Sequence, residues 1–106
     1  MSDDGSSARN TAEASEGAEV RVLEIVNKKG LHARASAKFC QTVERFDADV
    51  RVTRGHETVG GTSIMGLMML GAGIGSTITV AATGNEAAAV TDALEKLVSS
   101  GFGEED

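Results

Sequence analysis

One histidine, His32, stands between an extended apolar run and a helical pattern. The run over residues 20–26 stops at a basic turn that ends in Gly30, and the helical pattern begins at Ala33. The first N–H groups of a helix lack intrahelical partners and carry the positive end of its dipole, so they form an anion site. Arg34 adds a planar cation that suits phosphate oxygens. The spacing predicts an imidazole that accepts a phosphoryl group, and the alternative is a histidine that only caps the helix.

The stretch from Gly30 to Ala37 reads Gly-Leu-His-Ala-Arg-Ala-Ser-Ala. It resembles the active-site stretch Gly-Leu-His-Ala/Thr-Arg-Pro-Ala of HPr, the histidine phosphocarrier family of the bacterial phosphotransferase system. Ala35 stands where the family usually has proline, an early helical position at which no N–H bond is lost, so Ala35 can keep the same backbone path. The resemblance implies that His32 carries phosphate on Nδ1 and that Arg34 helps to neutralise it.

Strands and helices alternate along the chain in a pattern that can position this histidine. Apolar periodicity predicts strands over residues 20–26, 49–54, 57–61 and 76–82, and helices over residues 33–46, 63–70 and from Gly84-Asn85 to just before Gly101. This order, β-α-β-β-α-β-α, with helices on one face of a four-stranded sheet, makes a two-layer α/β open-faced sandwich. The hairpin requires an antiparallel pair. The HPr family has the same order of elements and an antiparallel sheet.

A second stretch, residues 61–70, is too apolar for a short helix with one buried stripe. If Leu67 and Leu70 face the core, other side chains stay outside, and flexible methionines suit a surface that meets several partners. The alternative is that all of them are core. We expect three of these residues to be exposed and to bind partners: Ile64, Met65 and Met68.

The same stretch resembles the Ser-Ile-Met-Gly segment of HPr proteins. In species that have a bifunctional HPr kinase/phosphorylase, the family's serine is a regulatory phosphorylation site, which implies this role for Ser63. A phosphate at this helix N-terminus would suit the dipole and would place negative charge in the apolar surface. The alternative is that Ser63 is only an N-cap.

The net charge of −6 lies at the two ends of the chain. We expect a disordered acidic leader over residues 1–18, one HPr-like domain over residues 19–103 and an acidic tail over residues 104–106. The middle of the chain is neutral, which argues against nucleic-acid binding through a broad basic face. No apolar run approaches the ~20 residues of a membrane span, and no signal peptide is recognisable. A single cysteine, Cys40, indicates a reducing compartment, and we expect a cytoplasmic protein.

Other chemistry is not expected. One histidine, His56, beside one acid, Glu57, is no metal constellation. The glycine-rich residues 71–75 lack the Gly-Lys-Ser/Thr of a nucleotide loop, and Cys40 is expected to be a buried apolar group. We therefore expect no metal and no cofactor.

Two functions remain. The first is a phosphoryl carrier, a phosphorylated intermediate without turnover of its own, which accepts phosphate on His32 from enzyme I and passes it to EIIA-type proteins, as the resemblance implies. The second is a regulatory binding module controlled at Ser63, with HPr kinase/phosphorylase as a further partner. We expect a monomer in both cases. The variant motif also resembles the nitrogen-related branch of the system, so the sugar-uptake and nitrogen-regulatory branches both stay open.

Overall fold

The computed structural model describes residues 18–104, so the expected leader lies outside the described residues except for Ala18. The elements follow the predicted order β-α-β-β-α-β-α. They are β1 (Ala18–Glu24), α2 (Ala33–Glu44), β2 (Asp49–Arg54), β3 (Glu57–Gly60), α3 (Ile64–Met69), β4 (Thr77–Thr83), α4 (Ala87–Ser99) and a short 3-10 turn, η1 (Gly101–Gly103).

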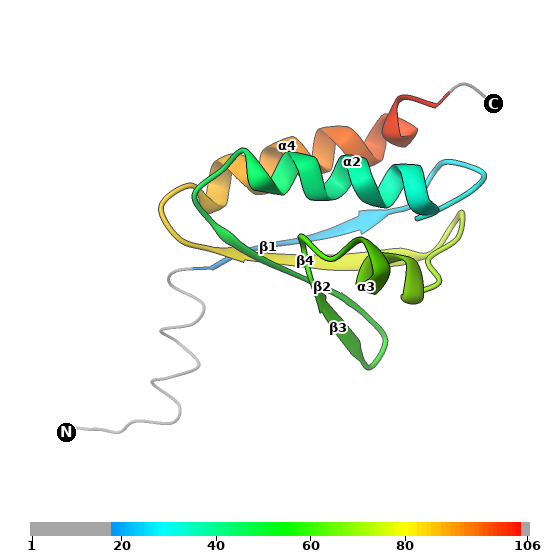
Figure 1. Cartoon of the computed structure of the whole chain (residues 1–106), viewed down its shortest axis with the longest axis horizontal. Helices are drawn as coiled ribbons and strands as arrows, with labels where there is room; N and C mark the ends of the chain where they lie inside the picture. Colours follow the sequence, from blue (N-terminus) through cyan, green and yellow to red (C-terminus); the bar gives the residue numbers. More distant parts are fainter. Residues whose placement is uncertain (1–17, 105–106) are drawn as a thin grey trace.

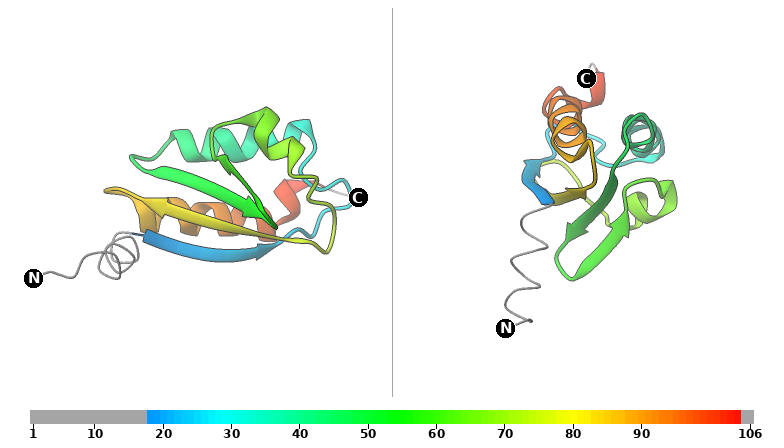
Figure 2. Two further views of the ribbon diagram at one scale, coloured as in Figure 1. Left: turned by 90° about the horizontal axis from the view of Figure 1, so that it is seen from below. Right: turned by 90° about the vertical axis from the view of Figure 1, so that its left-hand side faces the viewer.

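The four strands of this part of the chain form one antiparallel sheet in the order β1-β4-β2-β3. β4 pairs with both β1 and β2, and β3 forms the predicted hairpin with β2. Helices α2 and α4 cover one face of the sheet (Figure 1), and the end-on view in Figure 2 shows the resulting two layers. The smaller helix α3 packs beside α2 and next to β3. This arrangement confirms the open-faced sandwich.

The core lies between the sheet and the two long helices. Val50 and Val52 in β2 and Ile78 and Val80 in β4 are buried, because alternate residues of a strand face the same side. The helices contribute Ala35, Phe39, Val43, Val90, Leu94 and Val98. Burial of this apolar stripe turns the remaining faces of α2 and α4 outward.

The first strand ends at Glu24, two residues earlier than the apolar run predicts. The N–H of Ile25 donates to the carbonyl of Ser76 (2.8 Å), and the carbonyl of Ile25 accepts from the N–H of Gly75 (2.8 Å). Ile25 is therefore still paired and fully buried, but its partners lie in the loop before β4. Gly75 has a φ of +87°, a left-handed conformation that a regular strand does not contain.

The first helix ends at Glu44, before the expected residue 46. The N–H groups of Arg45 and Phe46 donate to the carbonyls of Thr42 and Val43, three residues back. The last turn therefore tightens to a 3-10 pattern, as is common at helix ends. Phe46 still packs against the core. The remaining bounds differ only slightly from the prediction.

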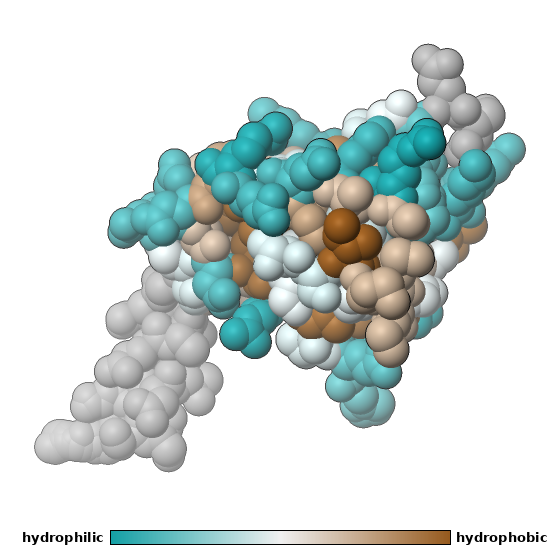
Figure 3. Space-filling model, viewed as in Figure 1, coloured by the Kyte–Doolittle hydropathy of each residue, from teal (hydrophilic) through white to brown (hydrophobic). Residues whose placement is uncertain are grey.

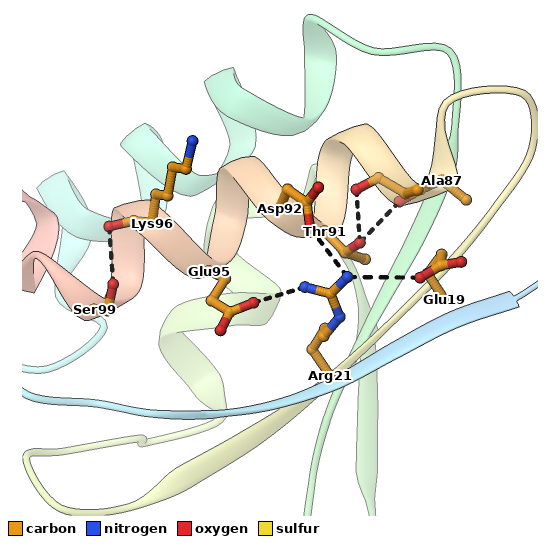
Figure 4. Close-up of polar contacts among 9 residues, drawn as sticks. Glu19, Arg21, Ala87, Thr91, Asp92, Glu95, Lys96 and Ser99 are labelled. Atoms are coloured by element: carbon orange, nitrogen blue, oxygen red, sulfur yellow. Dashed lines mark hydrogen bonds and ion pairs between the residues drawn. The ribbon is translucent and has the colours of Figure 1, made fainter.

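Arg21 joins β1 to α4 at the surface (Figure 4). Its guanidinium lies 3.0 Å from Asp92 and 2.6 Å from Glu95, both on α4, and 3.6 Å from Glu19 on its own strand. The hydrogen bonds to Asp92 and Glu95 raise the pKa of Arg21 above its ordinary value. Exposed ion pairs add little stability, so this cluster links the strand to the helix but contributes little to the stability of the fold.

Candidate functional site

The turn before His32 is held against the segment that follows α3. The N–H of Leu31 donates to the carbonyl of Ala72 (3.0 Å). Gly30 has a φ of +65°, and a Cβ at this position would collide with that same carbonyl. Only glycine fits both the backbone conformation and the close approach. The turn therefore places His32 at one defined point, beside residues 71–73.

His32 is the N-cap of α2, as predicted. Its backbone is extended (φ −74°, ψ −178°), and its carbonyl accepts the first helical hydrogen bond, from Ser36 (2.8 Å). Its ring nitrogen Nδ1 accepts a hydrogen bond from the backbone N–H of Arg34 (3.2 Å). The imidazole thus lies at the positive end of the helix dipole. Ala35, the residue in place of the family's proline, is buried in the first turn of this helix.

The other ring nitrogen, Nε2, contacts a carboxylate oxygen of Glu104, Oε2. The second oxygen of this carboxylate, Oε1, accepts a hydrogen bond from the amide nitrogen of Asn27 (3.1 Å). The hydrogen bond with His32 holds the pKa of Glu104 below its ordinary value, and the Asn27 amide and the nearby charge of Lys29 act in the same direction. Residue 104, expected in the acidic tail, therefore contacts the histidine ring.

A pocket of about 640 Å³ opens beside the imidazole. Its lining residues are Lys29, His32, Ala33, Arg34, Lys38, Gly103 and Glu104. Three of them are bases and one is an acid, and the helix N-terminus adds partial positive charge. The pocket therefore favours an anion next to the ring.

An apolar patch lies over α3 (Figure 3). Leu67 and Leu70 are buried, whereas the three residues expected outside are exposed, which confirms the predicted faces of this helix; the exposed residues are Ile64, Met65 and Met68. Sequence reasoning missed two further exposed side chains, Met69 and Ile74. We call these five residues the α3 surface. Met68 also lines a smaller hollow together with Leu31 and His32, so the α3 surface borders the histidine.

Ser63 is the N-cap of α3, and it is exposed. Its hydroxyl oxygen accepts a hydrogen bond from the N–H of Gly66 (3.0 Å). A Cβ at residue 66 would lie 2.9 Å from that oxygen and 2.9 Å from Cβ of Val59, so glycine lets the helix start close to β3. The side chain of Ser63 is therefore open to solvent.

The residues set aside by the sequence lie away from this chemistry. Cys40 is buried, and burial raises the pKa of its thiol. His56 lies exposed in the turn between β2 and β3. Within residues 18–104, no three His, Cys, Asp or Glu side chains are grouped to hold a metal ion. In the same range, every helix is too short or too polar to cross a membrane.

Sequence reasoning missed four residues of the pocket region: Asn27, Lys29, Lys38 and Glu104. Two signals in the sequence indicated contacts of this kind. Phe102 is a large apolar residue between two glycines in an otherwise polar segment, which indicates an anchored end. Asn27 directly follows the buried apolar run, where a polar side chain needs a partner.

The fold and the histidine at a helix N-terminus beside a basic pocket define a small α/β domain with a phosphocarrier arrangement. The family model described as PTS HPr component phosphorylation site matches residues 18–100. The phosphocarrier protein HPr of Neisseria meningitidis serogroup A is 49% identical over 82 residues, which are 77% of this chain and 92% of that protein. The phosphocarrier protein NPr of Shewanella violacea is 40% identical over 84 residues, which are 79% of this chain and 92% of that protein.

The solved structures agree. The crystal structure of HPr-C-His from Thermoanaerobacter tengcongensis matches with a TM-score of 0.79 at 39% identity, and the match covers 83% of this chain and 99% of that one. The chain therefore belongs to the HPr family of phosphocarrier proteins of the phosphotransferase system.

Proposed function

We propose that this chain accepts a phosphoryl group on Nδ1 of His32 from enzyme I and passes it to an EIIA-type protein. The observation that carries the proposal is the position of Nδ1, which accepts the N–H of Arg34 at the N-terminus of α2, in the basic pocket. Transfer between proteins needs positioning and charge neutralisation more than bond chemistry from the carrier. A site as small as this one can supply both.

The charges around Nδ1 suit the group that it would receive. A phosphate on Nδ1 would replace the ring nitrogen as acceptor for the first N–H groups of α2. The guanidinium of Arg34 and the ammonium groups of Lys29 and Lys38 border the same pocket. They would neutralise the added negative charge through charge-assisted contacts.

The α3 surface supplies a docking area at the border of the site. A carrier must be released after each transfer, so its complexes must be weak and quickly reversed. Exposed methionines adapt to differently shaped partners without strong fixed contacts. We propose that enzyme I and the EIIA-type protein both dock on this surface, with the chain acting as a monomer in the cytoplasm.

Labelling tests the proposal. The protein is incubated with enzyme I and phosphoenolpyruvate, and we expect an acid-labile, base-stable phosphate that disappears in His32→Ala and persists in Ser63→Ala. The label should discharge quickly to an EIIA-type protein. Discharge to the EIIA protein of the sugar-uptake branch or of the nitrogen-related branch identifies the branch. Absence of label at His32 in the unmodified protein would refute the carrier function.

A second role is favoured by the exposure of Ser63 at the border of the α3 surface. Phosphate on this N-cap would suit the helix end and would place about two negative charges beside apolar docking residues. We propose that HPr kinase/phosphorylase, where the cell has it, uses Ser63 to weaken docking. If label appears only with ATP and this kinase, and only at Ser63, the chain is a regulatory binding module instead of a carrier.

A further inference from the structure

We propose that Glu104, held in place by Asn27, is a positioning residue that fixes the ring orientation and the tautomer of His32 for phosphoryl transfer. This inference rests on the proposed carrier function and adds a part of the site. Glu104 lies beyond residues 18–100, where the family model matches. The carboxylate contacts Nε2, while Nδ1 faces the N–H of Arg34 on the opposite edge of the ring.

Both oxygens of the Glu104 carboxylate are engaged. Oε2 contacts the imidazole, and Oε1 accepts from the Asn27 amide, which also donates to the carbonyl of Gly30 (3.0 Å). Asn27 is only 3% exposed. Its amide therefore joins the turn before His32 to the carboxylate behind the ring, and the ring cannot rotate without losing its contact with this anchored carboxylate.

The stability of the fold alone does not explain a buried asparagine at position 27. Its carbonyl oxygen, Oδ1, is buried and has no hydrogen-bond partner among the described residues. A buried acceptor without a partner destabilises a fold. The group that Asn27 does use is its NH₂, and that group points at Gly30 and Glu104. The residue is thus placed for its two donor contacts at the site.

The chain reaches the ring through a rigid end. Gly101, Phe102 and Gly103 all have positive φ, of +67°, +59° and +72°. For Phe102 this conformation is unfavourable, and it persists because the side chain is almost fully buried. The ammonium group of Lys38 donates to the carbonyl of Phe102 (2.7 Å). This anchoring delivers Glu104 to one position, which a loose acidic tail could not do.

The geometry determines which nitrogen is the nucleophile. Nδ1 accepts an N–H, so it carries a lone pair and no proton, and the ring proton lies on Nε2, where it is donated to the carboxylate. A carboxylate behind a histidine fixes the tautomer and the orientation of its ring.

The transfer then needs no proton to leave. The Nδ1 lone pair attacks phosphorus, the bond between phosphorus and the donor's histidine nitrogen breaks, and its electron pair returns to the donor. The ring of His32 becomes positively charged with Nε2–H retained, and Glu104 compensates this charge. On discharge the Nδ1–phosphorus bond breaks, and the electron pair returns to Nδ1. The same ring state is restored for the next cycle.

Kinetics with two phosphoryl donors test the inference. The full chain, Glu104→Ala, Glu104→Gln and the control Glu57→Gln, which changes an exposed carboxylate in the β2–β3 hairpin, are labelled with enzyme I and phosphoenolpyruvate and separately with phosphoramidate. For Glu104→Ala we expect kcat to fall about tenfold, the scale of losing a carboxylate behind a histidine, with KM for the chain unchanged because the α3 surface is intact. Glu104→Gln should fall less, because its amide oxygen can still accept Nε2–H. Glu57→Gln should match the unmodified protein.

Nitrogen-15 NMR of the His32 ring supplies an independent readout. We expect a protected Nε2–H signal in the unmodified protein and in Glu57→Gln, and its loss in Glu104→Ala. Equal labelling rates for the unmodified protein and both Glu104 variants, with either donor, would overturn the inference, as would a change in KM alone. Failure of enzyme I to label the unmodified protein would refute the carrier function instead, and phosphoramidate would still report on Glu104. If Glu104→Ala does not fold, Glu104→Gln decides.

Discussion

At the scale of single residues, the chemistry depends on what surrounds one imidazole. Both ring nitrogens of His32 have a partner: the backbone N–H of Arg34 donates to Nδ1, and the carboxylate of Glu104 contacts Nε2. The first contact comes from the helix that the histidine itself caps, and the second comes from the far end of the chain. A free histidine would rotate and would exchange its proton between the two nitrogens, so these contacts preorganise the ring.

Arg34→Ala tests the neutralisation of the phosphate. Arg34 is exposed at the pocket, and its loss removes a charge-assisted contact that a phosphate would make. We expect labelling by enzyme I to slow by about 10-fold or more, or about 1.4 kcal/mol in activation free energy. Arg51→Ala, which removes an exposed arginine paired with Asp49 on β2, is the matched control and should leave the rate unchanged. An equal rate in Arg34→Ala would exclude its guanidinium from the site.

The titration of Glu104 tests the contact to the ring directly. The pKa of this carboxyl is lowered in the folded protein, chiefly by the hydrogen bond with His32. The stability that this contact gives the folded protein is therefore fully present above the ordinary glutamate pKa of about 4.3. It is lost as pH falls through the lowered pKa. Carbon-13 NMR should show a midpoint for Glu104 below about 4.3 in the unmodified protein and an upward shift in His32→Ala. A midpoint that is the same in both proteins would contradict the contact.

At the scale of elements, the turn before α2 positions His32 through the close approach of Gly30 to the Ala72 carbonyl. Gly30→Ala should destabilise the fold for two reasons, the positive φ of +65° and the collision with the Ala72 carbonyl. Gly55→Ala is the matched control, since Gly55 has a φ of +63° and no atom near its added Cβ. We expect Gly55→Ala to lose about 1 kcal/mol from strain and Gly30→Ala to lose about 1–3 kcal/mol more from overpacking. Urea unfolding measures both, and equal losses would show that the contact to residue 72 is unimportant.

The α3 surface and the open face of the sheet allow a matched test of docking. Met65 and Val22 are each 66% exposed, but Val22 points away from the helices, because it alternates with the buried Leu23 in β1. We expect Met65→Lys to raise KM for labelling by enzyme I about tenfold with kcat unchanged, as for a central interface residue. Val22→Lys should alter neither value. An effect of Val22→Lys as large as that of Met65→Lys would place the docking area elsewhere.

At the scale of the whole molecule, the middle of the chain has no net charge, and the net charge of −6 lies at its two ends. Residues 1–17 offer few apolar side chains to bury. We expect their deletion to leave the melting temperature nearly unchanged, as measured by circular dichroism. The deletion stops before Ala18, because Ala18 pairs with Thr83 in the sheet. A large drop in melting temperature would show that the leader packs on the domain.

The sequence by itself determined the element order, the position of His32 at a helix N-terminus and the outward side chains of α3. Each of these follows from local information: apolar periodicity, glycine turns and a helix too short to bury every side chain. The same reasoning placed the end of β1 at residue 26, because it could not foresee that Ile25 pairs with the loop before β4.

Only the tertiary structure decided what lies behind the imidazole. Glu104 is 72 residues from His32 and 77 residues from Asn27, and no periodicity connects such distant positions. Their contact depends on α4 packing on the sheet and on the buried Phe102, whose unfavourable φ the core imposes. From composition, the last residues were predicted to form only an acidic tail. Packing instead brought one carboxylate to the ring that we propose carries the phosphate.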